Sequence, residues 1–361
     1  MTGRTDKFVR EVKEVLEWDI LKFWSGMQDP RGGFYGRISE DGTAEKDAIR
    51  EEQLNARILW VFSIAYRQLR KKEYLMPAIS AKEFFVQHFL DHKFGGAYTA
   101  VDAWGERMNS DASLGNQALA IYSLSEFYRA TKDDEALKCA VNLFRIVEKE
   151  FLDADNGGYV ESLVRDFSPK DDSKVAESHL YLLEGYANLY RTWRDEGLRD
   201  RLAALLDLLA AKFFNPATGH LVTRFSRNWS DPVPGCRYGT DLEASWAMLD
   251  AAYAVQDIDI VDKVKGLCGH LCRAGMEGMT PDGHLSTSDT DPGMEPWVQA
   301  EALIGNLCAW KYLCDAEGAN RALAIWDFIK AHQSAEGNRN AYRRYPMHGA
   351  RACIQVLNLF R

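Results

Sequence analysis

Polar and charged side chains recur along this chain at matching places, each near the start of an otherwise apolar stretch. Arginine and amide side chains form paired hydrogen bonds to substrate oxygens, and histidine exchanges a proton near neutral pH. Such a set suits the binding of hydroxyl groups and proton transfer. Its members are Asn55, Arg57, Asn116, Gln117, Glu177, His179, Asp241, Glu243, Gln299, Glu301, His348 and Arg351.

Aromatic residues close to these polar groups point to a carbohydrate, because an aromatic face packs on a sugar ring. They are Trp60, Trp246, Trp297 and Tyr345. Helix capping is an alternative role for Asn and Asp at helix starts, and for Asn55, Asn116 and Asp241 both interpretations stay open. Arg57 and Glu243 are different, because a charge inside an apolar helix is costly unless it is paired or used.

The elements that must position these residues are announced by a repeated glycine turn. Gly33, Gly96, Gly158, Gly219 and Gly283 follow one another at intervals of 61 to 64 residues. Glycine adopts backbone angles that other residues avoid, so each position predicts a tight turn or a short hairpin. A sixth, degenerate turn is expected at Gly337-Asn338.

Between the turns, apolar residues recur at helical spacing, which predicts two helices in each repeat. The first helix of each pair is apolar on most faces and the second is amphipathic, so the first is expected inside and the second outside. We predict an all-α fold of about twelve helices in one domain, 1–361, namely an (α/α)6 barrel with six inner and six outer helices. An open helical solenoid is the alternative. The expected outer helices are 76–92, 134–151, 197–213, 258–273 and 318–332.

If the inner helices run in the same direction, their polar starts converge on one mouth of the barrel. Positively polarised helix starts would also favour an anion or an enolate there. The chain therefore predicts a sugar site at this mouth.

Composition excludes several other classes of protein. The net charge is −9, so we expect neither nucleic acid nor an anionic membrane as a partner. No apolar run reaches the length of a membrane span, and the charged start is unlike a secretory signal. Seven scattered cysteines indicate reduced thiols in a cytoplasmic protein. We find no spacing typical of a metal or cofactor site, and we expect neither.

Six short motifs occupy equivalent repeat positions: NARILW at 55–60, QALAIY at 117–122, HLYLLE at 179–184, YGTDLEASW at 238–246, PWVQAE at 296–301 and YPMHG at 345–349. In this order they resemble the N-acylglucosamine 2-epimerase superfamily, which includes cellobiose 2-epimerases and mannose isomerases. The resemblance runs nearly end to end, and the superfamily is built as an (α/α)6 barrel.

The resemblance implies proton transfer next to the aldehyde of an open-chain reducing sugar. A base removes the C2 proton and leaves an enediolate; reprotonation at C2 gives the epimer and at C1 the ketose. The resemblance assigns the base to His348, with Arg57 near the reacting oxygens and Glu243 orienting or charging a histidine. The expected sugar-binding residues are Trp60, Gln117, Glu177, His179, Tyr181, Thr240, Asp241, Trp246, Trp297, Gln299, Glu301 and Tyr345.

The chain departs from the superfamily pattern at three of these positions. Thr240 stands where the superfamily has a second histidine base, Tyr181 replaces another histidine, and Glu177 replaces an asparagine. Threonine cannot accept a proton at neutral pH, whereas His348 alone could move a proton between C2 and C1 on one face. One-base isomerisation is therefore expected to survive. Tyr181 could donate to a substrate oxygen, and Glu243 could act as an acid if burial raises its pKa.

Two other functions stay open at this point. A glycoside hydrolase or lyase on the same barrel would need two carboxylates across a cleft. Glu177, Asp241, Glu243 and Glu301 supply candidates for these. A non-catalytic sugar-binding protein would not need a base at His348. The expected partner in each case is a small sugar, and a homodimer is expected from the resemblance and from general frequency.

Overall fold

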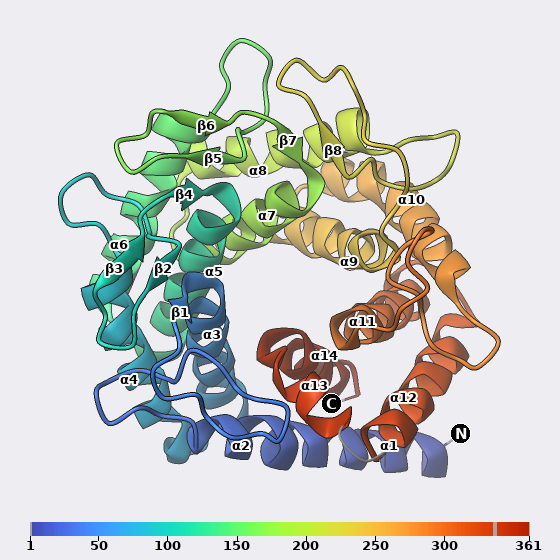
Figure 1. Cartoon of the computed structure of the whole chain (residues 1–361). Coiled ribbons are helices and arrows are strands. Elements are labelled where there is room, and N and C mark those ends of the chain that lie inside the picture. The colour runs from blue at the N-terminus through green and yellow to red at the C-terminus, as the bar shows by residue number, and fades with distance from the viewer. Residues whose placement is uncertain (1, 335–337, 361) are drawn as a thin grey trace.

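The structure is a computed structural model that describes residues 2–334 and 338–360. Its helices form two concentric rings (Figure 1). Within the described residues, six helices make the inner ring, and each packs against the next until the last returns to the first. These inner helices are α3 (Glu52–Leu69), α5 (Leu114–Thr131), α7 (Ala176–Tyr190), α9 (Tyr238–Val255), α11 (Pro296–Tyr312) and α14 (Pro346–Leu359). The all-α barrel predicted from the repeats is confirmed.

The five predicted outer helices are present, and several extend through a final π-helical turn. They are α4 (Leu75–Phe84) with Phe85–Phe89, α6 (Asp134–Ile146) with Val147–Phe151, α8 (Glu196–Leu208) with Leu209–Phe213, α10 (Ile258–Gly275) and α12 (Gly318–Ser334). Helix α6 shows why they lie outside, because it buries Ala136, Ala140 and Phe144 on one face and exposes charged residues on the other.

The sixth outer position is taken by the N-terminal segment, which sequence patterns did not assign. It consists of α1 (Thr2–Glu14), a π-helical stretch (Val15–Leu21) and α2 (Lys22–Ser25). This segment packs against α14, so the beginning of the chain covers the last inner helix. Gly337 of the expected sixth turn lies outside the described residues, and the short helix α13 (Asn338–Arg343) begins next to it.

The predicted glycine turns are short hairpins. In each, the residues that flank the turn form an antiparallel bridge, as between Leu152 and Tyr159. Gly158 adopts a φ of +71°, and a Cβ atom there would lie 2.8 Å from the Trp229 ring. Another residue at this position would therefore meet both backbone strain and a clash.

Short antiparallel strands join neighbouring repeats in front of the inner helices, and sequence patterns did not predict them. Strand β1 leads directly into α3, β4 into α5 and β7 into α7. The strands thus tie the starts of α3, α5 and α7 to the neighbouring repeats at one end of the barrel. They are β1 (Arg50–Glu51), β2 (Ala100–Val101), β3 (Arg107–Asn109), β4 (Ala112–Ser113), β5 (Ser162–Leu163), β6 (Pro169–Asp171), β7 (Lys174–Val175) and β8 (Arg224–Phe225).

Candidate active site

Two glutamines among the predicted sugar-binding residues fasten glycine turns to inner helices. Oε1 of Gln117 accepts from the Ala97 backbone N–H at 2.7 Å, and its Nε2 donates to the Ala97 carbonyl at 3.0 Å. Gln299 makes the same pair of bonds to Leu285, at 2.9 and 2.8 Å. Both side chains are fully buried. The amide groups of both side chains are therefore taken up by hydrogen bonds to the backbone.

His179 and Asp241 occupy the equivalent place in their repeats. Nε2 of His179 accepts from the Tyr159 backbone N–H at 3.0 Å, and its Nδ1 lies 2.7 Å from the Val175 carbonyl. Burial lowers the pKa of His179 to about 4, so the ring is neutral. Asp241 accepts from the Leu221 N–H at 2.8 Å and also hydrogen bonds to His220. Gln117, His179, Asp241 and Gln299 thus each accept a hydrogen bond from the backbone N–H of the residue that follows the glycine turn of their repeat.

Replacing Gln117 with leucine is expected to lower the free energy of unfolding by about 2–3 kcal/mol, because the buried N–H and carbonyl of Ala97 lose their partners. Denaturant unfolding followed by circular dichroism measures this change. Gln117→Glu should cost less than the leucine variant at low pH, where the protonated carboxyl keeps both a donor and an acceptor. Equal stability of the leucine variant and the wild type would show that Gln117 does not fasten the turn.

Asn55, Asn116 and Asp241, for which helix capping was an alternative role, are not the N-cap residues of their helices. The N-cap residues of their helices are Glu51 and Ser113 for α3 and α5, and the residue before Tyr238 for α9. Asn55 instead donates from within α3 to the Glu51 carbonyl at 2.9 Å. Asn116 accepts from Gln53 at 3.2 Å.

The centre of the barrel is held by Arg351 of α14. Its Nη1 lies 2.5 Å from Glu184 of α7, and its Nη2 lies 2.5 Å from Glu243 of α9 and 2.7 Å from Glu301 of α11. All four side chains are nearly fully buried. One guanidinium therefore ties four of the six inner helices together, and we call these four residues the arginine hub.

The carboxylates of the hub do not share one charge state. Although burial opposes ionisation, Arg351 and the hydrogen bond from His348 lower the pKa of Glu301 to about 2. Burial and the charge of Glu301 hold the pKa of Glu243 well above its usual range, and burial raises the pKa of Glu184 to about 7. Glu301 is therefore the ionised partner of Arg351, whereas Glu243 and Glu184 resist ionisation. This follows because one cation cannot compensate three buried anions.

His348 stands one helical turn from Arg351 and is oriented by the hub. Its Nδ1 lies 2.8 Å from Glu301 Oε1. An ionised carboxylate can only accept, so Nδ1 carries the proton and Nε2 keeps a lone pair. Burial lowers the pKa of His348 to about 4, against the pull of Glu301, so the ring is neutral. No described residue hydrogen bonds to Nε2, which leaves this nitrogen for a substrate.

A second polar group lies on the opposite wall, around Tyr181 of α7. Its hydroxyl donates to Glu177 Oε1 at 2.7 Å and accepts from Arg57 Nη2 at 3.3 Å. Arg237 lies 3.8 Å from the other oxygen of Glu177. Tyr181 is only 6% exposed, whereas the Glu177 side chain is 35% exposed. The fold thus brings Arg57, Glu177 and Tyr181 together, as the predicted mouth requires.

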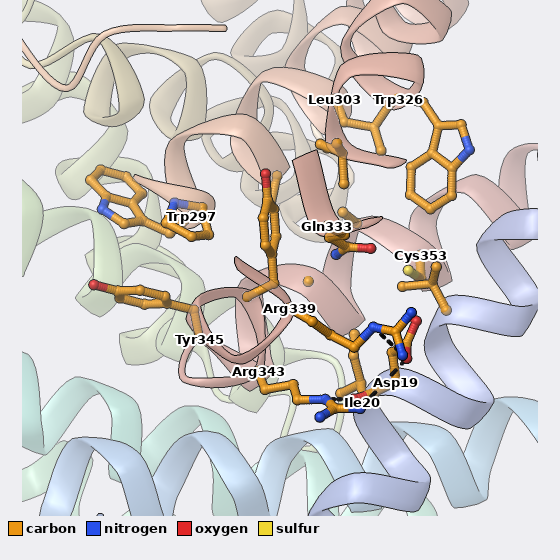
Figure 2. A pocket seen from close by; sticks show the side chains of 17 residues that line it. Asp19, Ile20, Trp297, Leu303, Trp326, Gln333, Arg339, Arg343, Tyr345 and Cys353 are labelled. Carbon is orange, nitrogen blue, oxygen red and sulfur yellow. Dashed lines mark hydrogen bonds and ion pairs between the residues drawn. The ribbon is translucent and has the colours of Figure 1, made fainter. Parts of the chain in front are cut away.

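Trp297 and Tyr345 lie close to His348. The Trp297 and His348 rings are 5.7 Å apart, and Nε1 of Trp297 donates to Glu295. Behind Trp297 and Tyr345 is a largely apolar pocket between the N-terminal segment and α11–α14 (Figure 2). Its cavity volume of about 40 Å³ holds no more than a few water molecules, far less than a ligand pocket. This pocket is therefore not a sugar site.

Trp60 and Trp246 line a different space. Together with the hub arginine, they border a polar cavity of about 220 Å³ towards the C-terminal ends of the inner helices. Trp246 donates from Nε1 to Glu301 at 2.8 Å, and the Arg351 guanidinium lies 4.6 Å from its ring. Thr240 sits on the His348 side of α9, one turn before Glu243, with its hydroxyl buried and without a partner among the described residues. Arg351 thus lies between this polar cavity and the polar residues around His348 at the starts of the inner helices.

Glu243, Glu301 and His348 could in principle be metal ligands. One ligand atom from each lies within 4.8 Å of the others, although sequence spacing gave no sign of such a cluster. Arg351 Nη2 contacts both carboxylates and lies 3.3 Å from His348 Nδ1. A divalent cation would have to displace the guanidinium, so these residues do not fit a resident metal.

Two residues of the hub received no role in the sequence analysis. Glu184 was noted only as a member of a motif and Arg351 only as one of the polar residues near the inner-helix starts, yet each is a charge inside an otherwise apolar helix. Each also lies three residues after another candidate, Tyr181 or His348, and residues three apart share a helix face. That spacing is the signal that could have identified them.

Comparison with known proteins identifies the family of this chain. Residues 33–345 match the N-acylglucosamine 2-epimerase (GlcNAc 2-epimerase) family. A cellobiose 2-epimerase of Bacteroides fragilis is 34% identical, with 96% of this chain and 98% of the relative covered. A D-mannose isomerase of Marinomonas mediterranea is 20% identical, with 84% and 81% covered. The solved structure of cellobiose 2-epimerase from Bacillus thermoamylovorans superposes with a TM-score of 0.91, at 30% identity and 98% and 99% coverage.

The fold and these relatives define a carbohydrate epimerase or isomerase built on a helical barrel. The chain belongs to the N-acylglucosamine 2-epimerase family. The comparisons do not favour a hydrolase, a lyase or a non-catalytic binder. No helix in the described part of the chain has the length and apolar character needed to cross a membrane.

Proposed function

We propose that His348 is the base that removes the C2 proton of an open-chain reducing sugar. The observation that carries this proposal is the neutral His348 ring, whose Nδ1 is fixed by ionised Glu301 and whose Nε2 is left for the substrate. Arg57 supplies a positive charge on the same side of the hub, where charge develops on the enediolate oxygens. The hub itself positions the base through Glu301.

The replacement of the second histidine base affects which product forms. Thr240 has no group that accepts a proton at neutral pH, so His348 has no histidine partner on α9. A single base can return the proton to C1 on the same face, which gives the ketose. Formation of the 2-epimer needs another donor on the opposite face. We therefore propose aldose–ketose isomerisation as the reaction that His348 supports alone.

Solvent exchange tests the proposed function. The protein is incubated in D2O with mannose, glucose, N-acetylmannosamine, cellobiose or lyxose, and the C1 and C2 proton signals are followed by NMR. Cellobiose is included because several relatives are cellobiose 2-epimerases. We expect loss of the C2 proton signal, or appearance of a ketose, with at least one sugar. The absence of both exchange and ketose formation with every one of them would contradict the proposal.

The exchange rate is expected to stay constant as the pH falls from 8 to about 5.5 and to decline only below it. Burial lowers the pKa of His348 to about 4. Its neutral, proton-accepting form therefore persists to lower pH than that of an ordinary histidine. Initial rates of deuterium incorporation measure the profile, with circular dichroism at each pH to verify folding. A midpoint at or above pH 6.5 would assign the base to another group.

We also propose a cytoplasmic location and a homodimer. All seven cysteines are free thiols, and six of the seven have a raised pKa because of burial, which suits a reducing compartment. Sedimentation of the purified protein tests the homodimer, which rests on general frequency and the family resemblance.

A further inference from the structure

Tyr181 and His348 lie on opposed walls of the barrel. In the inner ring, α7 is the third neighbour of α14 in both directions. Arg351 and Glu184 join these two helices directly, at 2.5 Å. His348 precedes Arg351 by three residues, and Tyr181 precedes Glu184 by three residues. Both side chains therefore stand about one helical turn, roughly 4.5 Å, above the same link and face each other across it.

The surroundings of Tyr181 are those of a proton donor. Its hydroxyl donates to Glu177 at 2.7 Å and accepts from Arg57 at 3.3 Å. Burial and the charge of Glu177 hold the pKa of Tyr181 well above its usual range, so the phenol keeps its proton until the enediolate takes it. The Arg57 charge opposes this rise and would stabilise the phenolate that remains. Arg57 also acts electrostatically on the pKa of His348, so it serves both walls.

Glu177 connects this buried phenol to solvent. The Tyr181 side chain is almost fully buried, while the Glu177 side chain is 35% exposed and lies 3.8 Å from Arg237. A carboxylate in this place holds the phenol in one orientation and can relay a proton from water. The acids Glu184 and Glu243 are each bonded to Arg351 at 2.5 Å in the hub below.

We propose that Tyr181 delivers a proton to C2 of the sugar from the wall opposite His348, with Glu177 as its positioning residue. The chain would then form the 2-epimer as well as the ketose. This inference rests on the proposed function, because it requires the enediolate that His348 creates.

The proton balance of this step is complete without a further reactant. Nε2 of His348 takes the C2 proton, and the C–H electron pair forms the C1–C2 double bond while O1 becomes an enediolate oxygen. The Tyr181 O–H bond then breaks, and its proton bonds to C2 on the other face as the C1 carbonyl re-forms. His348 is left protonated and Tyr181 is left as a phenolate. Water resets both, the phenolate by way of Glu177, and nothing is oxidised or reduced.

Tyr181→Phe separates the two products. We expect the rate of 2-epimer formation to fall at least 100-fold and ketose formation to change less than about 5-fold. In D2O, the wild-type 2-epimer should carry solvent deuterium at C2, whereas ketose formed by His348 should retain part of the substrate proton at C1. Tyr253→Phe removes a hydroxyl from a 43% exposed tyrosine outside the site and serves as the matched control.

Glu177→Gln provides the second variant, in case the phenylalanine variant fails to fold. It should lower the ratio of epimer to ketose about 10-fold, a readout that a merely structural role would leave unchanged. Unaltered epimer formation in the folded Tyr181→Phe or Glu177→Gln protein would overturn the inference. C2 exchange by the wild type without any 2-epimer would overturn the inference alone. The absence of both C2 exchange and ketose formation would overturn the proposed function with it.

Discussion

Replacing Arg351 with methionine is expected to lower the free energy of unfolding at pH 7 by about 3–5 kcal/mol, because the change leaves buried carboxylates without their cation. Arg351 contacts Glu184, Glu243 and Glu301 at 2.5 to 2.7 Å, and all are nearly inaccessible to water. Methionine fills similar space but carries no charge. Denaturant unfolding at pH 7 measures the loss.

The pH dependence of this loss identifies its cause. Without Arg351 the pKa values of all three carboxyl groups are expected to lie above 4.5, their usual value. A raised carboxyl pKa gives stability that is present at low pH and is lost as the pH rises. The gap between the variant and the wild type should therefore shrink as the pH falls from 7 to 5. A gap that stays constant over this range would point to packing rather than charge.

His348→Asn is expected to slow C2 exchange and product formation by about 10³-fold, because general-base catalysis contributes a factor of this order. The asparagine amide can still donate to Glu301 from the place of Nδ1, 2.8 Å from that carboxylate. The contact to the hub is thus kept and only the base is removed. NMR in D2O with the sugar that the wild type converts measures the rate.

The thermal midpoint of His348→Asn provides the control for folding. It should stay within a few degrees of the wild-type value, because the hub remains paired. An asparagine variant that is folded and still exchanges C2 at the wild-type rate would exclude His348 as the base. Epimer formation that survives together with exchange would instead point to the wall around Tyr181.

The double ring could be predicted from sequence because its signals are local. Glycine turns recur at a nearly constant interval, and a helix that is apolar on most faces must lie inside. The N-terminal helix could not be assigned by the same means, since it belongs to no complete repeat. The strands between repeats were missed for a related reason: each has only two or three residues, and its partner lies in another repeat.

The candidate site was predicted in part. Arg57, Tyr181 and Glu177 contact one another, and Arg57 acts electrostatically on His348, in agreement with the convergence that the helix starts indicated. Gln117 and its equivalents occupy matching positions but bond to backbone, because a polar side chain in an apolar helix looks the same in sequence whether it serves a turn or a ligand.

The pairing of residues within the arginine hub was beyond sequence patterns. Arg351 and Glu184 are 167 residues apart and meet only when the ring is closed. A pairing of this kind depends on the whole topology rather than on any local motif. The same is true of the cluster of Glu243, Glu301 and His348, which come from three different inner helices.

The position of Arg351 on the last inner helix also constrains how the protein is made. A ribosome delivers Glu184, Glu243 and Glu301 before it delivers Arg351. Until α14 docks, these three carboxylates must remain hydrated or protonated, because burying them as anions without a cation is too costly. Burying them as anions and closing the ring are therefore one event. A nascent chain can fold its early helix pairs, but it becomes a catalyst only when α14 is in place.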